Sequence, residues 1–268
     1  MTATEIVAVF DAAHADYATL APRLWNPLGK VLVAHSRPRT GERVLDAFCG
    51  AGASALPAAR AVGPSGRVDA VDLADALLEE GRAAALAMPQ VRFVKADVRD
   101  WRAPAGYDLV QSGFGVFFLP DMDAGSKALL GLLRDGGRFA VQTWRQAALV
   151  EFAECLLDAV RDESSQPPSM PEASASRRID TPGKLHQWLE SLGLAGVRVS
   201  QVPFHPPLEP ELAWGLALGS GFRALLDPLE PDGVARVRAG LLRRIGRRRL
   251  KVLDASCLVG TGTLGRGR

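Results

Sequence analysis

Residues 44–52, VLDAFCGAG, combine a short apolar stretch, one carboxylate and a turn with two glycines. A strand that leads through such a turn into a helix makes a ligand cradle, because glycines let a ligand approach the backbone and the first helix amides point at it. Gly50 and Gly52, followed by small residues, also loosely resemble the G-x-G-x-x-A pattern of dinucleotide sites. The stretch predicts a nucleotide-like ligand; the alternative is a tight strand-to-helix turn without one.

Asp46 distinguishes between the ligands that this cradle could hold. Its carboxylate lies just before the turn, where it would repel a pyrophosphate, so an NAD-linked dehydrogenase is disfavoured. S-Adenosylmethionine (SAM) carries an ammonium group and a sulfonium and has no phosphate. Since a buried carboxylate without a cationic partner costs several kcal/mol or stays protonated, Asp46 favours SAM.

Two further acids follow the next two apolar stretches. Asp72 closes RVDAVD, and Asp97 closes VRFVKAD and precedes Val98. The carboxyl ends of parallel strands meet at one edge of a sheet, which is where open α/β folds bind ligands. We expect Asp72 at the ribose hydroxyls, Asp97 at the adenine amine and the Val98 amide facing the ring. Each acid alone is equally well explained as a helix cap or turn residue, but three at consecutive strand ends predict one crevice.

The elements that position these acids alternate between strands and helices. Strands are expected at 43–48, 67–73, 91–97, 107–113 and 138–144, and helices at 5–21, 26–36, 55–62, 74–87 and 123–134. This alternation implies right-handed crossovers and a mostly parallel sheet that is covered on both faces.

The rhythm changes after residue 144. The pattern predicts helices at 147–162 and 181–193, helices within 208–246 that break at 225–233, and strands at 197–204 and 250–259. A Pro- and Ser-rich stretch at 164–176 is expected to be a mobile loop. The segment therefore adds two strands to the sheet, with helices between them that could form a cap.

Composition is consistent with a folded protein that has a large core. The 268 residues are 47% hydrophobic and 23% charged, and the net charge is +2, so charge alone does not indicate a polyanion-binding protein. Cys49, Cys155 and Cys257 are scattered, without metal-ligand spacing, which argues for a reducing compartment and against a metal site. No secretion signal is recognised at residues 1–17, and no apolar run reaches the roughly 18 residues of a membrane helix. A cytoplasmic protein without membrane contact is expected.

These motifs together resemble the class I SAM-dependent methyltransferases. VLDAFCGAG is similar to their motif I, VDL to the ribose acid and KADV to the adenine strand. YDLVQSGFGVFFLPD and LLRDGGRFAVQTW resemble the fourth and fifth strands of the UbiE-like group, which includes many small-molecule methyltransferases of bacterial secondary metabolism. FDAAHADYATLAPRLW resembles that group's N-terminal helix, and LGSGFRALLDPLEPDGVARVR its cap. The similarity is clear over about residues 8–145, with Phe48 standing where the common pattern has glycine.

The resemblance implies a fold, a cofactor and a set of contacts. The fold would be a single α/β domain over 1–268, with a Rossmann-like seven-stranded sheet whose last strand is antiparallel and helices on both faces. Its core would lie at about 28–145 with the two later strands, and its cap at 1–27, about 160–180 and 206–246. SAM would be converted to S-adenosylhomocysteine (SAH). The expected cofactor contacts are Tyr17, Trp25, Asp46, Phe48, Gly50, Gly52, Asp72, Leu73, Asp97, Val98, Ser112 and Phe114.

Methyl transfer from a sulfonium needs alignment and exclusion of water more than it needs acid–base groups. His14, three residues before Tyr17 on one helix, is the candidate base, with His205 behind it. An acceptor that is already acidic, or catalysis by proximity alone, would need neither. Trp101 is a further aromatic candidate for the sulfonium, although core packing explains it as well. The expected acceptor contacts are Phe117, Trp214, Phe222 and Arg223, which favour a flat or lipophilic molecule from secondary metabolism or quinone-like biosynthesis.

Two alternative functions stay open. Six basic residues between 243 and 251 could contact RNA, but cations at the end of a helix also suit its dipole. The QSGFG end of the fourth strand moreover lacks the Asn/Asp-Pro-Pro-aromatic motif of base-amino methyltransferases. A SAM-binding protein that performs non-methylating chemistry is the other alternative, because fold alone does not fix function.

Overall fold

The computed structural model describes residues 2–103, 105–164 and 175–265. Within them, seven strands form one sheet in the order β3-β2-β1-β4-β5-β7-β6. They are β1 (Arg43–Ala47), β2 (Arg67–Asp72), β3 (Val91–Lys95), β4 (Tyr107–Gly113), β5 (Leu133–Trp144), β6 (Leu194–Val202) and β7 (Cys257–Leu264). The first five strands pair in parallel, and β7 pairs antiparallel with β5 and β6. The predicted Rossmann-like sheet with an antiparallel last strand is confirmed.

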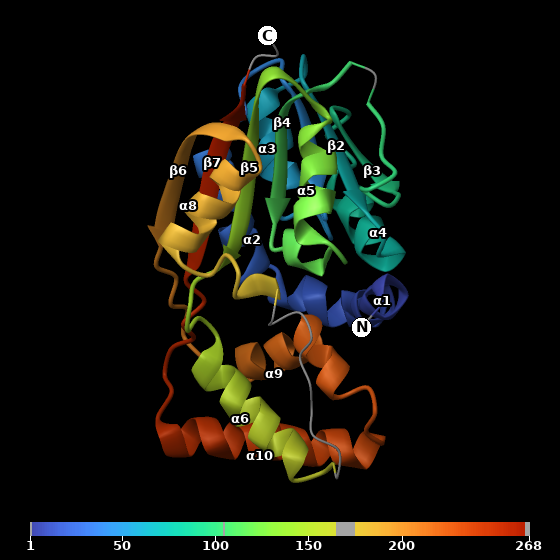
Figure 1. Cartoon of the computed structure of the whole chain (residues 1–268). Coiled ribbons are helices and arrows are strands. Elements are labelled where there is room, and N and C mark those ends of the chain that lie inside the picture. Colours follow the sequence, from blue (N-terminus) through green and yellow to red (C-terminus); the bar gives the residue numbers. More distant parts are fainter. Residues whose placement is uncertain (1, 104, 165–174, 266–268) are drawn as a thin grey trace.

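Helices cover both faces of the sheet (Figure 1). One face packs against α5 (Met122–Leu130) and α8 (Pro182–Ser191). The other packs against α2 (Trp25–Ser36), α3 (Ala55–Val62) and α4 (Asp75–Ala84). The central strands β1 and β4 are buried nearly throughout, which explains why they read as continuous apolar runs.

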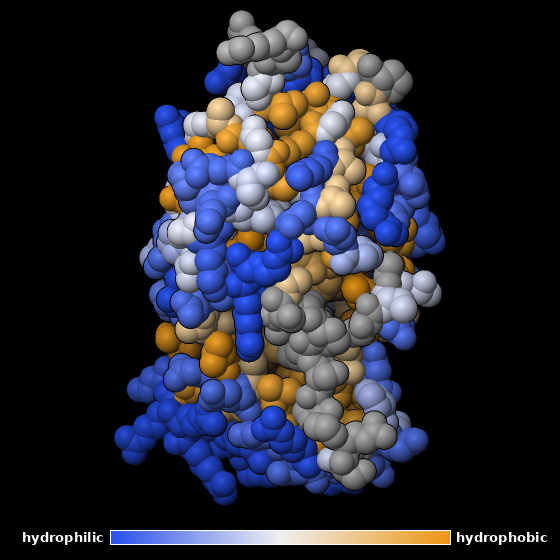
Figure 2. Space-filling model, in the orientation of Figure 1, coloured by the Kyte–Doolittle hydropathy of each residue, from blue (hydrophilic) through white to orange (hydrophobic). Residues whose placement is uncertain are grey.

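A second layer lies beyond the carboxyl ends of the parallel strands (Figure 1). It contains α6 (Val150–Arg161), α9 (Pro210–Leu218), the short helix η2 (Gly221–Leu225) and α10 (Pro231–Arg248), which share one apolar cluster. The N-terminal helix α1 (Ala3–Leu20) lies between this layer and the sheet. Figure 2 shows that the outer side of the layer, over α10, is mostly hydrophilic. We call α6, α9, η2 and α10 the cap.

Several predicted boundaries were wrong. The helix expected at 123–134 ends at Leu130, because the chain from Leu133 pairs with β4 and extends β5 past a register shift. The strand expected at 197–204 is β6, Leu194–Val202. The strand expected at 250–259 is β7, Cys257–Leu264, and the residues before it contribute only an isolated bridge between Pro207 and Val252.

Three further expectations concern a loop, membrane helices and metal sites. The Pro- and Ser-rich stretch predicted at 164–176 lies mostly outside the described residues. No helix of the described part is long and apolar enough to cross a membrane. Nor do the described residues contain a group of three or more His, Cys, Asp or Glu side chains able to hold a metal ion.

Candidate cofactor and acceptor site

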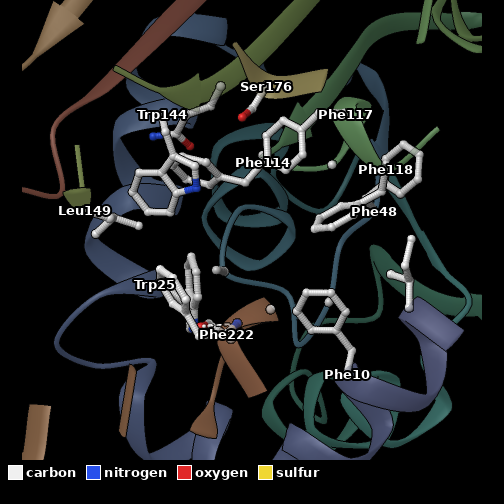
Figure 3. Close-up of a pocket in the computed structure, with 18 of the residues that line it drawn as sticks. Phe10, Trp25, Phe48, Phe114, Phe117, Phe118, Trp144, Leu149, Ser176 and Phe222 are labelled. Carbon is white, nitrogen blue, oxygen red and sulfur yellow. Dashed lines mark hydrogen bonds between the residues drawn. The ribbon is translucent and has the colours of Figure 1, made fainter. Parts of the chain in front are cut away.

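One cavity of about 1070 Å³ lies between the carboxyl edge of the sheet and the cap. Its lining comes from α1, from the loops after β1 to β5, from residues 176–184 and from the cap. Figure 3 shows its aromatic and apolar side chains, with Phe48, Phe117 and Phe118 together on one side and Trp25, Phe114 and Trp144 together on the other. The site predicted at the carboxyl ends of the strands therefore coincides with the large cavity.

The glycine loop after β1 forms the floor of this cavity. The Gly50 amide donates to Asp72 Oδ2 over 2.8 Å, and Gly50 adopts φ +51°, with a Cβ position 3.2 Å from the Tyr17 hydroxyl. Gly52 (φ +88°) does not line the cavity; a Cβ there would lie 2.7 Å from the Phe93 ring. Gly50 therefore shapes the cavity, whereas Gly52 serves packing between the loop and β3.

Phe48, the departure from the family pattern, also has a left-handed backbone, with φ +62°. Only glycine adopts this conformation at low cost, and another residue loses roughly 1–2 kcal/mol. Its ring lines the cavity and occupies a notch at Gly115, where a Cβ would lie 2.4 Å from Phe48 Cβ. The left-handed turn is thus formed without glycine at this position, and an aromatic ring is added to the cavity wall.

Asp72 and Asp97 lie where the strand-end argument puts them, on the cavity wall with Leu73 and Val98. Asp72 accepts the amides of Gly50, Leu73 and Ala74 over 2.7–2.9 Å, while burial raises its pKa above the usual value. Asp97 is paired with Arg99, whose guanidinium lowers the pKa of that carboxyl. Both carboxylates retain lone pairs that ribose hydroxyls or an adenine amine could use.

Asp46 is fully buried and does not line the cavity. Gln111 Nε2 donates to its Oδ2 over 3.2 Å, and its Oδ1 has no hydrogen-bond partner among the described residues. Burial raises the pKa of Asp46 to about 7. Asp46 therefore does not stand at the cavity wall, where we expected it, and any influence of this carboxylate on a bound cation acts through the floor of the site.

Four aromatic rings form a continuous set along the other wall. Tyr17 stacks on Trp25 with centroids 5.3 Å apart, and Phe114 stacks on Trp144 at 4.1 Å. Trp25 joins the two pairs, with its centroid 6.2 Å from each ring of the second pair. Burial raises the pKa of Tyr17 well above its usual value, so its hydroxyl stays neutral. Aromatic faces in a water-poor wall suit a sulfonium cation.

Other predicted contacts have mixed outcomes. Phe117 and Phe222 line the cavity, and so does the neighbouring Phe118. Trp214 does not line it, because the ring faces α10 with Arg238 over it. Arg223 does not line it either and pairs with Asp16 of α1.

Ser112 and Trp101 are also displaced from the expected site. Ser112 is fully buried inside β4 and absent from the cavity wall, so the following residues Gly113 and Phe114 take that place. Strand alternation explains the shift, since neighbouring side chains face opposite ways. Trp101 lies away from the cavity and donates to the Tyr107 hydroxyl over 2.9 Å.

No histidine stands among the described residues that line the cavity. His14 Nδ1 lies 2.8 Å from the Asp11 carbonyl oxygen, and His205 lies 3.6 Å from Asp254. The structure therefore places neither candidate base at the cavity wall.

Sequence reasoning missed several residues that line the cavity. Trp144 ends the predicted fifth strand and could have been found by the same strand-end rule, and Phe10 lies two helical turns before Tyr17. No comparable signal marked the later stretches. These contribute Arg145, Gln146, Leu149, Ser176, Arg177, Asp180, Lys184 and Leu216.

The residues present fit SAM better than a phosphorylated cofactor. The cofactor edge presents the carboxylates of Asp72 and Asp97, and the only cation paired there, Arg99, does not line the cavity in the described chain. Carboxylates repel phosphate groups and accept hydrogen bonds from hydroxyl, amino and ammonium groups. The glycine-shaped floor at Gly50 and the neighbouring aromatic rings complete a cradle for a cationic nucleoside.

The known proteins that this chain resembles point to the same group. Residues 44–137 match the family model described as a methyltransferase domain. Aklanonic acid methyltransferase DauC from Streptomyces sp. (strain C5) is 36% identical over 140 residues. That alignment covers 51% of this chain and 63% of the relative, less than two thirds of its length. Nocamycin O-methyltransferase from Saccharothrix syringae is 28% identical over 254 residues, 88% of this chain and 89% of that protein.

Solved structures show the same fold at low sequence identity. The [4+2]-cyclase SpnF is 14% identical with a TM-score of 0.62, over 100% of this chain and 98% of that one. Haemonchus contortus phosphoethanolamine N-methyltransferase 2, solved with SAM, is also 14% identical, with a TM-score of 0.57 over 96% of this chain and 57% of that one. The motif loop, the strand order and these similarities agree: residues 44–137 match a methyltransferase domain, and the chain resembles the class I SAM-dependent methyltransferases in fold and in sequence.

Proposed function

We propose that this protein transfers the methyl group of SAM to a small-molecule acceptor bound in the same cavity. The observation that carries the proposal is the continuity of the cavity from the acids of β2 and β3 to the aromatic wall and the cap. At about 1070 Å³ it exceeds the roughly 300–1,000 Å³ of a single ligand pocket. It therefore has room for a cofactor and an acceptor side by side.

The residues divide this task between them. Asp72 and Asp97 bind the nucleoside hydroxyl and amino groups, and Gly50 lets it lie against the backbone. Tyr17 and Trp25 cover the centre of the cavity and exclude water. When bound, SAM supplies a methyl group that is already activated by the sulfonium. The protein then has to hold the acceptor in line with that group, and positioning of this kind contributes several kcal/mol of the barrier.

The acceptor side favours a flat or lipophilic molecule. Phe48, Phe117, Phe118, Trp144 and Phe222 line it. The names of the two sequence relatives, an aklanonic acid methyltransferase and a nocamycin O-methyltransferase, support transfer to an oxygen of a natural product. We place the reaction in the cytoplasm, in keeping with three buried cysteines that form no disulfide.

Catalysis is proposed to rest on proximity and orientation. His14 was the candidate base, but neither it nor another histidine stands among the described residues of the wall. An acceptor that ionises near neutral pH needs no protein base to lose its proton.

The test is to incubate the purified protein with methyl-labelled SAM and two acceptor pools, a small-molecule extract of the source cell and its total RNA. We expect label in an extractable small molecule, and its mass would identify the acceptor. Label in RNA would overturn the proposal and redirect attention to the basic residues near the end of α10. Tight SAH binding with label in neither pool would favour non-methylating chemistry.

A further inference from the structure

The charges that line the cavity are distributed unevenly. The cofactor edge carries the acids Asp72 and Asp97, whereas Arg145, Arg177 and Lys184 lie on the acceptor side. We call these three residues the cationic rim. They come from the loop after β5 and from residues 176–184, and Figure 3 shows Ser176, the neighbour of Arg177, at the end of the cavity near Trp144 and Phe117.

Two of the three rim cations have acidic partners. Arg145 pairs with Asp254, and Lys184 Nζ donates to Asp180 Oδ1 over 2.8 Å. Asp180 is itself 9% exposed and lines the cavity, and its carbonyl oxygen accepts the Gln146 amide. The remaining acid on this side, Glu154, pairs with Arg248 at 2.6 Å. The local charges therefore cancel pairwise, apart from Arg177.

A hydrogen bond to its backbone holds Arg177 in place, and its guanidinium is available to bind a ligand. Its carbonyl oxygen accepts Lys184 Nζ over 2.8 Å, which fixes the residue beside the ammonium group. With the part of the chain that the structure describes, the guanidinium forms no ion pair or hydrogen bond. Lys184 uses two of its three ammonium protons for Asp180 and Arg177. An anion between these two side chains would receive a charge-assisted hydrogen bond from each.

We propose that the acceptor is an aromatic or lipophilic anion, whose ring system lies against Phe117 and Trp144 and whose acidic group binds Arg177 and Lys184. This inference rests on the proposed function, because it names the class of molecule that enters the acceptor side. The opposed charges would orient both ligands, with the cationic cofactor at the acids and the anionic group of the acceptor at the rim.

Two dyes that share one aromatic skeleton test the proposal without the natural acceptor. 8-Anilinonaphthalene-1-sulfonate carries one anionic group, and N-phenyl-1-naphthylamine carries none. Both are titrated by fluorescence into protein saturated with SAH, at low and moderate salt. We expect the anionic dye to bind several-fold more tightly than the neutral one, and the difference to shrink as salt rises.

Two variants test whether Arg177 causes the preference for the anionic dye. Arg177→Gln should weaken the anionic dye by about tenfold, the loss of roughly one charge-assisted hydrogen bond, and leave the neutral dye within about twofold. Arg178→Gln is the matched control, because Arg178 is also exposed but pairs with Asp123 and does not line the cavity. It should change neither affinity.

Equal affinities of the two dyes for the wild type, or equal weakening of both by Arg177→Gln, would overturn the proposal. Calorimetry of SAH on the same samples separates this outcome from a failure of the proposed function. If SAH binds to the wild type and to Arg177→Gln but the dyes show no preference, only the anionic class is wrong. If SAH does not bind to the wild type, the proposed function itself fails.

Discussion

At the scale of single residues, Asp46 is the carboxylate whose environment departs most from what the sequence suggested. It is fully buried, and burial raises its pKa to about 7. The folded state therefore binds a proton that the unfolded state releases near pH 4. The contribution of this group to stability is full below pH 4 and is lost as the pH rises towards 7.

Replacing Asp46 with Asn should remove that dependence. At pH 8 the variant should have the higher free energy of unfolding, by up to about 4 kcal/mol, since one pKa unit corresponds to about 1.4 kcal/mol. At pH 4 the two proteins should be nearly equal. Urea unfolding at several pH values measures this, and parallel curves for the two proteins would show that Asp46 titrates normally.

The same variant tests the electrostatic role assigned to Asp46 in cofactor binding. A bound ammonium or sulfonium favours the ionised carboxylate, so SAM affinity for the wild type should rise between pH 6 and 8. Asp46→Asn should bind SAM several-fold more weakly at pH 8 and lose this rise. Calorimetry that found the wild-type affinity unchanged in the variant would remove the argument that links Asp46 to SAM.

His14 gives a second prediction at this scale. Its imidazole is outside the cavity wall and Nδ1 lies against the Asp11 carbonyl oxygen. We therefore expect His14→Gln to keep kcat within about twofold and to leave the pH profile of kcat unchanged. A fall of 100-fold or more, the usual range for a lost general base, would restore His14 as the base. Tyr17→Phe, on the cavity side of the same helix, is the comparison variant.

The strand-end rule accounts for which site residues could be predicted. Asp72 and Asp97 follow directly from it, because a residue that closes a parallel strand lies at the carboxyl edge of the sheet, where the cavity is. Trp214 and Arg223 lie in helices of the cap, where the rotation of each helix decides which side chains face the ligand. That rotation depends on tertiary packing, such as the Arg223–Asp16 pair, and the sequence pattern did not specify it.

At the scale of elements, the loop after β1 and the turn after β4 are matched to each other. Phe48 fills the notch at Gly115, where a Cβ would lie 2.4 Å from both Cβ and Cγ of the phenylalanine. Gly115 has an ordinary negative φ of −108°, so alanine would cost packing and no backbone strain. The aromatic wall therefore depends on two loops that are far apart in sequence.

A double-mutant cycle measures this match. Gly115→Ala should destabilise the wild type by about 1–3 kcal/mol through overpacking, and should cost little in a Phe48→Gly background, where the notch is empty. Chemical unfolding of the four proteins gives a coupling free energy of about 1 kcal/mol or more. Additive effects would mean that the loops accommodate the extra methyl group independently.

Glycine also explains the element that was predicted least well. β7 runs from Cys257 to Leu264 and contains Gly260 and Gly262, which the pattern treats as breakers. A Cβ at Gly260 would lie 2.5 Å from Leu189 of α8. The strand uses glycine there because the helix packs close to the sheet. The central strands β1 and β4 were predicted well, since they are buried nearly throughout and need no such exception.

At the scale of the whole molecule, the cap packs directly against α1. Its inner face provides Phe10 and Tyr17 to the cavity, and its backbone at Asp16 meets Gly219 at the end of α9. Arg223 of η2 pairs with Asp16 beside this contact at 3.3 Å. The position of the cap, and with it Phe222 on the acceptor side, therefore depends on how closely Gly219 approaches α1.

Gly219→Ala should push the cap away from α1. A Cβ at Gly219 would lie 2.8 Å from the backbone carbonyl group of Asp16, which cannot move aside as a flexible side chain would. The φ of −97° is ordinary, so strain within residue 219 does not contribute. We expect a loss of about 1–3 kcal/mol in stability and weaker binding of a neutral aromatic dye to the SAH complex. Both are measured on the same protein, by unfolding and by fluorescence titration.

Gly246→Ala is the matched control for that variant. It lies within α10 in the same cap, and a Cβ there would meet nothing within 4 Å. Alanine at an open helical position should stabilise the protein by roughly 0.5–1 kcal/mol and leave dye binding unchanged. If Gly219→Ala behaved like Gly246→Ala, the cap would not depend on close contact with α1, and the acceptor side would have to be set by the core alone. If Gly219→Ala lowers the free energy of unfolding and Gly246→Ala raises it, the shape of the cavity depends on the contact between α1 and the cap.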